Sequence, residues 1–145
     1  MRDLISITLR GREYSLLPSF GALSNFEDRH GSIAAHYSAL VGLTATVSAR
    51  SWLVLQGLQA FRAETPPEGR SFDFTQTSVA EALFEGGLWH EAAVQVEIDL
   101  VEALLYTPEQ YLAKKAARTA IQALDAKMTE SLDVLTSFSA SSLPI

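Results

Sequence analysis

The sequence contains no cysteine. This absence excludes a disulfide framework, a thiol nucleophile and a thiolate metal site, and it fits a reducing compartment. Long hydrophobic runs are also missing, because every apolar stretch falls far short of the roughly 20 residues that span a bilayer. The N-terminus, Met1-Arg2-Asp3 and then an alternating segment, shows no secretory signal. We therefore expect a cytoplasmic protein with no membrane contact.

Basic residues are absent from the middle of the chain. The segment from Ser71 to Ala113 has no Lys or Arg and contains eight acidic residues. The formal charge of the chain is −6, so this segment carries −8 and the remainder carries +2. Nucleic-acid binders need clustered Lys and Arg for phosphate contacts, so the charge bias argues against that class. An acidic segment is typical of a solvated face, and it also suits a basic protein partner.

The length and hydrophobic content indicate one globular unit. A chain of 145 residues with 48% hydrophobic residues can bury about two-thirds of its unfolded surface in a single core. We predict a mainly α (α+β) fold: an N-terminal β-hairpin followed by about six helices packed as one bundle-like domain over 1–145. Its expected parts are a hairpin over 3–17, a helical core over 19–106, a C-terminal helix over 108–136 and a frayed tail over 137–145.

Period-two alternation marks the hairpin. In residues 4–9 every second side chain is apolar, and the side chains between them are mostly polar. A second strand over 13–17 follows the turn Arg10-Gly11-Arg12. Two strands alone are marginal in water. The hairpin should therefore pack on helices or pair with another chain.

Capping residues divide the next part of the chain into helices. Ser19 is the expected N-cap of a helix that runs to about His30, and Gly31 is its expected stop. Ser32 caps a second helix, whose predicted apolar face is Ile33, Tyr37, Leu40 and Val41. A third helix should begin near residue 48 and end before the Pro-rich loop at 65–69.

Three further helices follow that loop. Ser78-Val79-Ala80-Glu81 matches a capping box, and Gly86-Gly87 should end the helix that it starts. The next predicted helix, Leu88 to Tyr106, has a narrow polar stripe and is otherwise apolar, so we expect it to be central or to contact a partner. Thr107-Pro108 is a strong signal for the start of the last helix.

The sequence gives no support to an enzyme. His30, His36 and His90 lack the i, i+4 spacing of a helical metal pair, and each is expected to be a surface or cap histidine. Gly-x-Ser-x-Gly is absent, and no phosphate-loop pattern surrounds the Gly86-Gly87 pair. The carboxylates at 97, 99 and 102 are read as ordinary solvated residues rather than an acid/base pair. We predict no catalytic, cofactor-binding or metal-binding residues and no cofactor.

Candidate partner-binding residues come from two features. Large aromatics at helical spacing are mostly core residues, but two phenylalanines flank Asp73 in a loop, where they either staple the loop down or anchor a partner. The exposed side of the 88–106 helix adds an aromatic residue and acids that suit a basic client. The predicted partner-binding set is Phe72, Phe74, Trp89, Glu91, Asp99 and Glu102.

Short motifs in the first part of the chain resemble the tail assembly chaperones of long-tailed phages, in the version found in gene transfer agents. Parts of that family are also labelled tail tube proteins. The resemblance covers about Leu4 to Tyr106, whereas the residues after Pro108 extend beyond it. The motifs are Gly11-x-x-Tyr14-x-Leu16, Phe20-x-Ala22-Leu23-x-x-Phe26-Glu27, Gly31-Ser32-Ile33 and Leu55-x-Gly57-Leu58.

This resemblance implies a non-enzymatic function in a bacterial host cytoplasm. Such proteins bind the tape-measure protein, or other tail proteins, and keep that long helical chain soluble during tail morphogenesis. Helix-in-groove contacts would recognise such a client. Two alternatives stay open: a structural tail tube or virion protein, and an unrelated helical protein-interaction adaptor. The sequence also leaves a homo-oligomer open.

Overall fold

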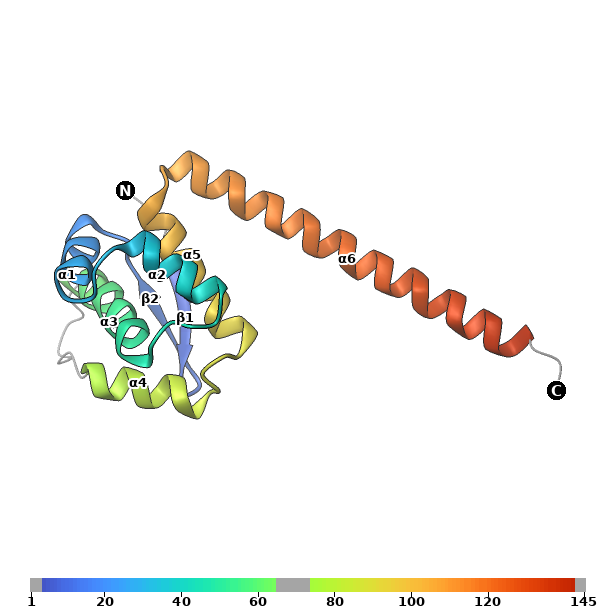
Figure 1. Cartoon of the computed structure of the whole chain (residues 1–145), viewed down its shortest axis with the longest axis horizontal. Coiled ribbons are helices and arrows are strands. Elements are labelled where there is room, and N and C mark those ends of the chain that lie inside the picture. The colour runs from blue at the N-terminus through green and yellow to red at the C-terminus, as the bar shows by residue number, and fades with distance from the viewer. Residues whose placement is uncertain (1–3, 65–73, 143–145) are drawn as a thin grey trace. The chain divides into compact units, whose positions relative to one another are not determined.

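The computed structural model describes residues 4–64 and 74–142 (Figure 1). The chain separates into two compact units, Met1–Pro108 and Glu109–Ile145. The described residues are mainly helical with an N-terminal two-stranded hairpin, which confirms the predicted fold class. The single domain expected over 1–145 stays a prediction.

The hairpin has the alternation that the sequence predicts. Strands β1 (Ile5–Leu9) and β2 (Arg12–Leu16) are antiparallel, with Leu9 opposite Arg12. Arg10 and Gly11 have φ values of 51° and 77°, which is typical of the two-residue type I′ turn that matches strand twist. The apolar side chains of β1 are buried and those between them are exposed. The hairpin packs on helices, as a two-stranded sheet requires.

The first helix begins and ends, and the second helix begins, where the capping signals predict. The Ser19 hydroxyl caps α1 (Phe20–His30) by accepting from the Ala22 amide at 3.1 Å. Gly31 ends that helix at a φ of 84°, where a side chain would strain the backbone. Ser32 caps α2 (Ile33–Val41).

The buried face of α2 is one residue out of register with the prediction. It consists of Ile33, His36 and Leu40, while Val41 is exposed and Tyr37 is partly exposed. Neighbouring positions on a helix point about 100° apart. The buried face continues from Ile33 to the position three residues later, a histidine, whereas the predicted face continued to the position four residues later. An apolar pattern alone does not select a polar residue for burial, which is why the prediction missed His36.

Helix α3 (Val47–Glu64) is central, because residues all around it are buried. A Cβ atom at Gly57 would lie 3.2 Å from both Cβ and Cδ2 of Leu16, so glycine allows β2 to approach the helix. At the same point the Leu17 amide donates to the Gly57 carbonyl at 3.1 Å. The middle of α3 therefore packs closely against the end of the hairpin.

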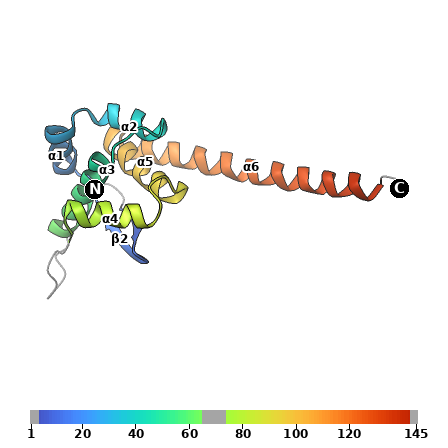
Figure 2. The same cartoon turned by 60° about the horizontal axis from the view of Figure 1, so that its bottom comes forward.

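The first unit has three layers, which Figure 2 shows from the side. Helices α3 and α5 (Glu91–Leu105) form the middle layer, and α5 packs on β1, α2 and α3. The hairpin and α4 (Gln76–Glu85) lie on one side of this layer, and α1 and α2 lie on the other. The central position expected for the 88–106 helix is confirmed, although that helix begins later, at Glu91.

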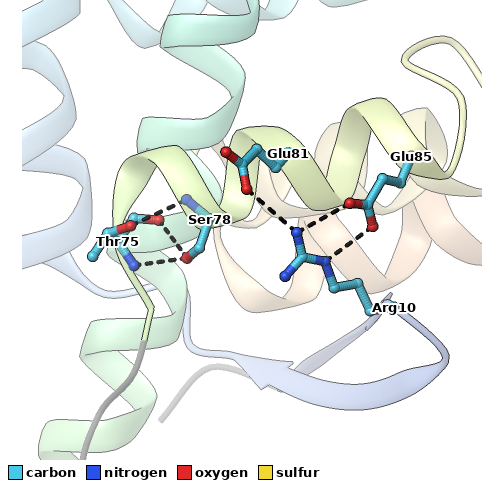
Figure 3. Close-up of polar contacts among 5 residues, drawn as sticks. All are labelled: Arg10, Thr75, Ser78, Glu81 and Glu85. Atoms are coloured by element: carbon cyan, nitrogen blue, oxygen red, sulfur yellow. Dashed lines mark hydrogen bonds and ion pairs between the residues drawn. The ribbon is translucent and has the colours of Figure 1, made fainter.

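The start of α4 corrects the predicted capping box. The N-cap is Thr75, whose hydroxyl accepts from the Ser78 amide at 3.1 Å, while the Ser78 hydroxyl accepts from the Thr75 amide at 2.9 Å (Figure 3). Ser78 therefore takes the third helical position, and Glu81 is free for another contact. Arg10 of the hairpin turn donates to Glu81 at 3.4 Å and to Glu85 at 3.0 and 3.1 Å, which ties the turn to α4.

The second unit is described by α6 (Pro108–Ser142), a helix of 35 residues. It begins at Pro108, as predicted, but it continues past the expected end at residue 136. The stretch after 136 contains neither Gly nor Pro before Pro144, so no helix breaker stops it earlier. Its serines reduce helix propensity without ending the helix.

Candidate functional site

The turn between α4 and α5 presents an aromatic side chain at the surface. Gly86 ends α4, Gly87 has a φ of 90°, and His90 caps α5 by accepting from the Ala92 amide. Trp89 lies within this turn, with 38% of its surface exposed. The predicted start of the helix at Leu88 had placed Trp89 inside the helix; the His90 cap instead leaves it in the connecting turn.

A buried guanidinium supports one face of this ring. Arg50 lies in the first turn of α3 and is 1% exposed. Its Cζ atom stands 4.5 Å from the centre of the Trp89 ring. Cation–π attraction of this kind is stronger where the cation is desolvated, so the buried guanidinium helps to hold the partly exposed ring in place.

The guanidinium is in turn fixed by Glu97 of α5. Arg50 Nε donates to Glu97 Oε1 at 2.8 Å, and Nη2 donates to Oε2 at 2.6 Å. Glu97 is 0% exposed. Burial raises the pKa of Glu97, and the hydrogen bonds and charge of Arg50 oppose that rise. Two parallel charge-assisted bonds fix the orientation of the arginine as well as its position.

One nitrogen of the Arg50 guanidinium takes no part in the hydrogen bonds to Glu97. Arg50 Nη1 is buried and has no hydrogen-bond partner among the described residues. Burial without a partner is costly for a charged donor. Holding Arg50 beneath Trp89 therefore lowers the stability of the fold.

Exposed apolar and acidic side chains lie along the same segment. Phe84, near the end of α4, is 70% exposed, and Glu91 is exposed in the first turn of α5. Tryptophan is enriched among the residues that dominate protein–protein binding. We define the Trp89 platform as Trp89, whose ring lies on Arg50, together with exposed Phe84 and Glu91 on the two flanking helices. Aromatic and acidic side chains of this kind can bind an apolar surface that carries positive charge.

The structure places the other predicted partner-binding residues differently. Phe74 is half-buried, with its ring edge-on to that of Tyr14 at 4.8 Å, which favours the staple interpretation; Phe72 lies outside the described residues. Asp99 is half-buried and accepts from Gln95 at 2.9 Å. Glu102 is buried and accepts from the Tyr37 hydroxyl at 3.1 Å. Glu102 therefore belongs to the core, which corrects its prediction as a surface residue.

His90 and His36 lie in different environments. His90 is a cap, as predicted, whereas His36 is buried against the Phe26 ring, with 4.8 Å between ring centres. Burial, with smaller effects of His30 and Arg50, lowers the pKa of His36 to about 4. This corrects the prediction of a surface or cap role for His36: α2 turns its side chain inward beside Ile33 and Leu40.

Arg50 and Glu97 were missed by sequence reasoning. The one available signal was an arginine within the mostly apolar start of α3, and Glu97 looked like a solvated residue in an acidic segment. Their pairing joins positions 47 residues apart, and no spacing rule for a single helix reaches that far.

The described residues contain no group of three or more His, Asp or Glu side chains that could hold a metal ion. Over the same residues, no helix is both long and apolar enough to cross a bilayer. Comparisons with protein-family models, curated proteins and solved structures found no match to this chain.

Proposed function

We propose that this chain is a tail assembly chaperone of phage or phage-like particles, without enzymatic activity, and that it binds the tape-measure protein in the cytoplasm. The observation that carries the proposal is the Trp89 platform: a partly exposed tryptophan on the buried Arg50–Glu97 pair, with exposed Phe84 and Glu91 on the flanking helices. The motif resemblance supplies the client, and the platform supplies a surface with the chemistry to bind an amphipathic helix.

The chemistry of binding follows from the platform's composition. Trp89 and Phe84 would cover apolar side chains of a client helix, because large aromatics bury much area at a small cost in side-chain entropy. Glu91 would face basic residues at the rim of the contact. The net charge of −6 would repel neighbouring copies along a coated client and so keep the complex soluble.

Co-expression tests this proposal directly. The full chain is produced together with the longest helical protein encoded nearby, as the candidate tape-measure protein, and the soluble fraction is separated by size-exclusion chromatography. We expect co-elution and a larger soluble fraction of the client. The proposal is wrong if the client stays aggregated and this chain elutes alone.

Matched variants assign the binding to the platform. Trp89→Ala and Phe84→Ala should each reduce co-elution, while Phe20→Ala should not, because Phe20 is 83% exposed at the start of α1, away from the α4–α5 turn. Phe84→Ala is included because Trp89→Ala also removes a contact of Arg50. Circular dichroism of each variant confirms that the helices are retained.

A charge reversal tests the electrostatic part separately. Glu91→Lys should weaken client binding and reduce its dependence on salt. Glu64→Lys is the control, because Glu64 is an exposed acid at the end of α3. Equal effects of the two substitutions would contradict a local electrostatic contribution at the platform.

Two alternative functions have weaker support. A tail tube subunit needs a β-rich body that stacks into rings, whereas the described residues contain a single two-stranded sheet. An unrelated adaptor would use the same platform for another basic partner, and it would ignore the tape-measure protein in the co-expression experiment.

A further inference from the structure

The outer edge of β1 is an unpaired strand edge. Leu9 and Arg12 flank the two-residue turn and lie opposite each other, so they exchange backbone hydrogen bonds, as does every second pair along the hairpin. The residues between those pairs, Ser6 and Thr8, direct their backbone N–H and C=O groups away from β2. Among the described residues, no backbone hydrogen bond outside the hairpin involves Ser6 or Thr8, and both residues are exposed.

The two edges of the hairpin differ in charge. The outward-facing residues of β2 are Glu13 and Ser15, and its first residue, Arg12, is exposed. Folded proteins protect free strand edges with charged side chains, proline or bulges. Between Ile5 and Leu9, β1 has no charged residue, no proline and no break in its register with β2. The protecting charges are therefore on β2, and β1 is the edge that can accept another strand.

A second copy of β1 has the pattern that this edge requires. Two such strands can meet about a twofold axis that places Ile7, the middle residue of β1, opposite Ile7 of the other copy. Ser6 of each copy then lies opposite Thr8 of the other, and the outward N–H and C=O groups of both residues are used. Their hydroxyls share the exposed face, where Ser and Thr form favourable cross-strand pairs. The buried Ile7 side chains meet on the face that packs on the helices.

We propose that two copies of this chain pair edge to edge through β1, as antiparallel strands of one continuous sheet. The contact is isologous, so it closes with two copies and does not propagate into fibres. Like charges directly opposite each other would oppose the pairing of identical strands, and β1 has no charged residue. The pairing also enlarges a sheet of two strands, which is marginal by itself.

A strand of this chain is favoured over a segment of another protein because β1 is already ordered. Its pairing with β2 and its packing on α5 hold it extended before any partner arrives, so association orders little additional backbone. A disordered segment would have to become ordered on binding, which opposes association, and a helical client would first have to lose its helix. This pairing goes beyond the proposed function and uses no residue of the Trp89 platform.

Sedimentation equilibrium of the full chain tests the pairing. We expect the mass of a dimer for the wild-type chain and the mass of a monomer for Ser6→Pro. The control is Ser15→Pro, because Ser15 lies opposite Ser6 in the hairpin. At both positions the N–H that proline lacks points away from the hairpin, but only that of Ser6 lies on the β1 edge. Ser15→Pro should remain dimeric.

A second matched pair of variants avoids proline. Thr8 and Glu13 lie opposite each other and are both exposed. Lysine on a strand edge blocks pairing with another strand, so Thr8→Lys should be monomeric, whereas Glu13→Lys should remain dimeric. Far-UV circular dichroism of all four variants confirms that the fold is retained.

The proposal is overturned if the wild-type chain is monomeric at every concentration measured. It is also overturned if Thr8→Lys stays dimeric, since another surface then forms the dimer, or if Thr8→Lys and Glu13→Lys dissociate equally. Trp89→Ala and Phe84→Ala should reduce client binding without changing the mass of the chain alone. The pairing and the proposed function can therefore fail independently.

Introduced cysteines test the register, since the chain has none of its own. Ser6 of one copy lies directly opposite Thr8 of the other, whereas two Ser6 or two Thr8 positions are related diagonally, about 7–8 Å apart, which is too far for an unstrained disulfide. Mild oxidation of a mixture of Ser6→Cys and Thr8→Cys chains should therefore give a linked dimer, and neither variant alone should. A link in either variant alone, or none in the mixture, would overturn the alignment on Ile7.

Discussion

The guanidinium of Arg50 donates two hydrogen bonds, of 2.8 and 2.6 Å, to the carboxylate of Glu97, and both side chains are buried. This pair joins α3 to α5 across the middle layer of the first unit. Buried ion pairs often contribute less to stability than apolar replacements would, because desolvation offsets their attraction. Its position beneath Trp89 indicates a role in holding that ring at the surface.

Breaking the pair should be far more harmful than replacing it. We expect Arg50→Met alone or Glu97→Leu alone to lower the free energy of unfolding by about 3–5 kcal/mol, since each leaves an uncompensated buried charge. The double variant should recover most of that loss. Urea unfolding of the four proteins measures the coupling, and additive losses would show that the two side chains act independently.

The buried His36 should make stability depend on pH. Its pKa is lowered to about 4 in the folded chain, whereas in the unfolded chain it lies near its ordinary value of about 6.5. Below that value the unfolded chain binds a proton that the folded chain does not. Stability is therefore lost as the pH falls from about 6.5 to about 4, by at most about 3 kcal/mol, and the loss is complete below that range.

Substitution isolates this contribution from that of other groups. His36→Leu should remove the difference in unfolding free energy between pH 6.5 and pH 4 that the histidine causes. His90→Asn is the control, because it changes an exposed histidine and keeps a capping side chain. If both variants lose stability with pH as the wild-type chain does, His36 titrates normally in the fold.

Much of the fold could be predicted from local sequence. The hairpin, the caps at Ser19 and Ser32, the stop at Gly31 and the start of α6 at Pro108 each depend on a few neighbouring residues. The errors arose where two local signals compete. Thr75 and Ser78 are both residue types that cap helices, but only Ser78-x-x-Glu81 matched the Ser/Thr-x-x-Glu/Gln pattern, whereas the box that forms has Ser78 at its third position.

The candidate site was harder to predict because it depends on distant contacts. Trp89 could be singled out as an exposed aromatic, but its support by Arg50 and Glu97 exists only once α3 and α5 pack together. Glu102 and Asp99 lie on the same helix and are both acidic. Of the two, only Glu102 is buried, where it accepts a hydrogen bond from Tyr37. Burial of a single polar residue is a tertiary property, so helical periodicity did not distinguish the two.

The corrected cap of α4 can be tested by two substitutions. Thr75→Ala removes the side chain that accepts from the Ser78 amide and should lower the free energy of unfolding by about 1 kcal/mol. Thr77→Ala changes an exposed threonine in the first turn of the same helix and should leave stability within about 0.5 kcal/mol of wild type. Thermal unfolding measures both, and equal effects would contradict Thr75 as the cap.

Two helical glycines should respond to alanine in opposite directions. At Gly21 the nearest atom to a new Cβ is Ser19 Oγ at 3.9 Å, so Gly21→Ala should stabilise the chain by about 0.5–1 kcal/mol through helix propensity. At Gly57 the new Cβ would meet Cβ and Cδ2 of Leu16 at 3.2 Å. Leu16 Cβ is fixed to the strand backbone, and its side chain is fully buried.

The close contact at Gly57 should therefore outweigh the propensity gain. Overpacking of a core typically costs about 1–3 kcal/mol, so we expect Gly57→Ala to lower the free energy of unfolding by about 1 kcal/mol. Denaturant unfolding of both variants provides the comparison. Stabilisation by Gly57→Ala would mean that β2 can shift away from α3, and that the Leu17–Gly57 hydrogen bond does not fix the hairpin on that helix.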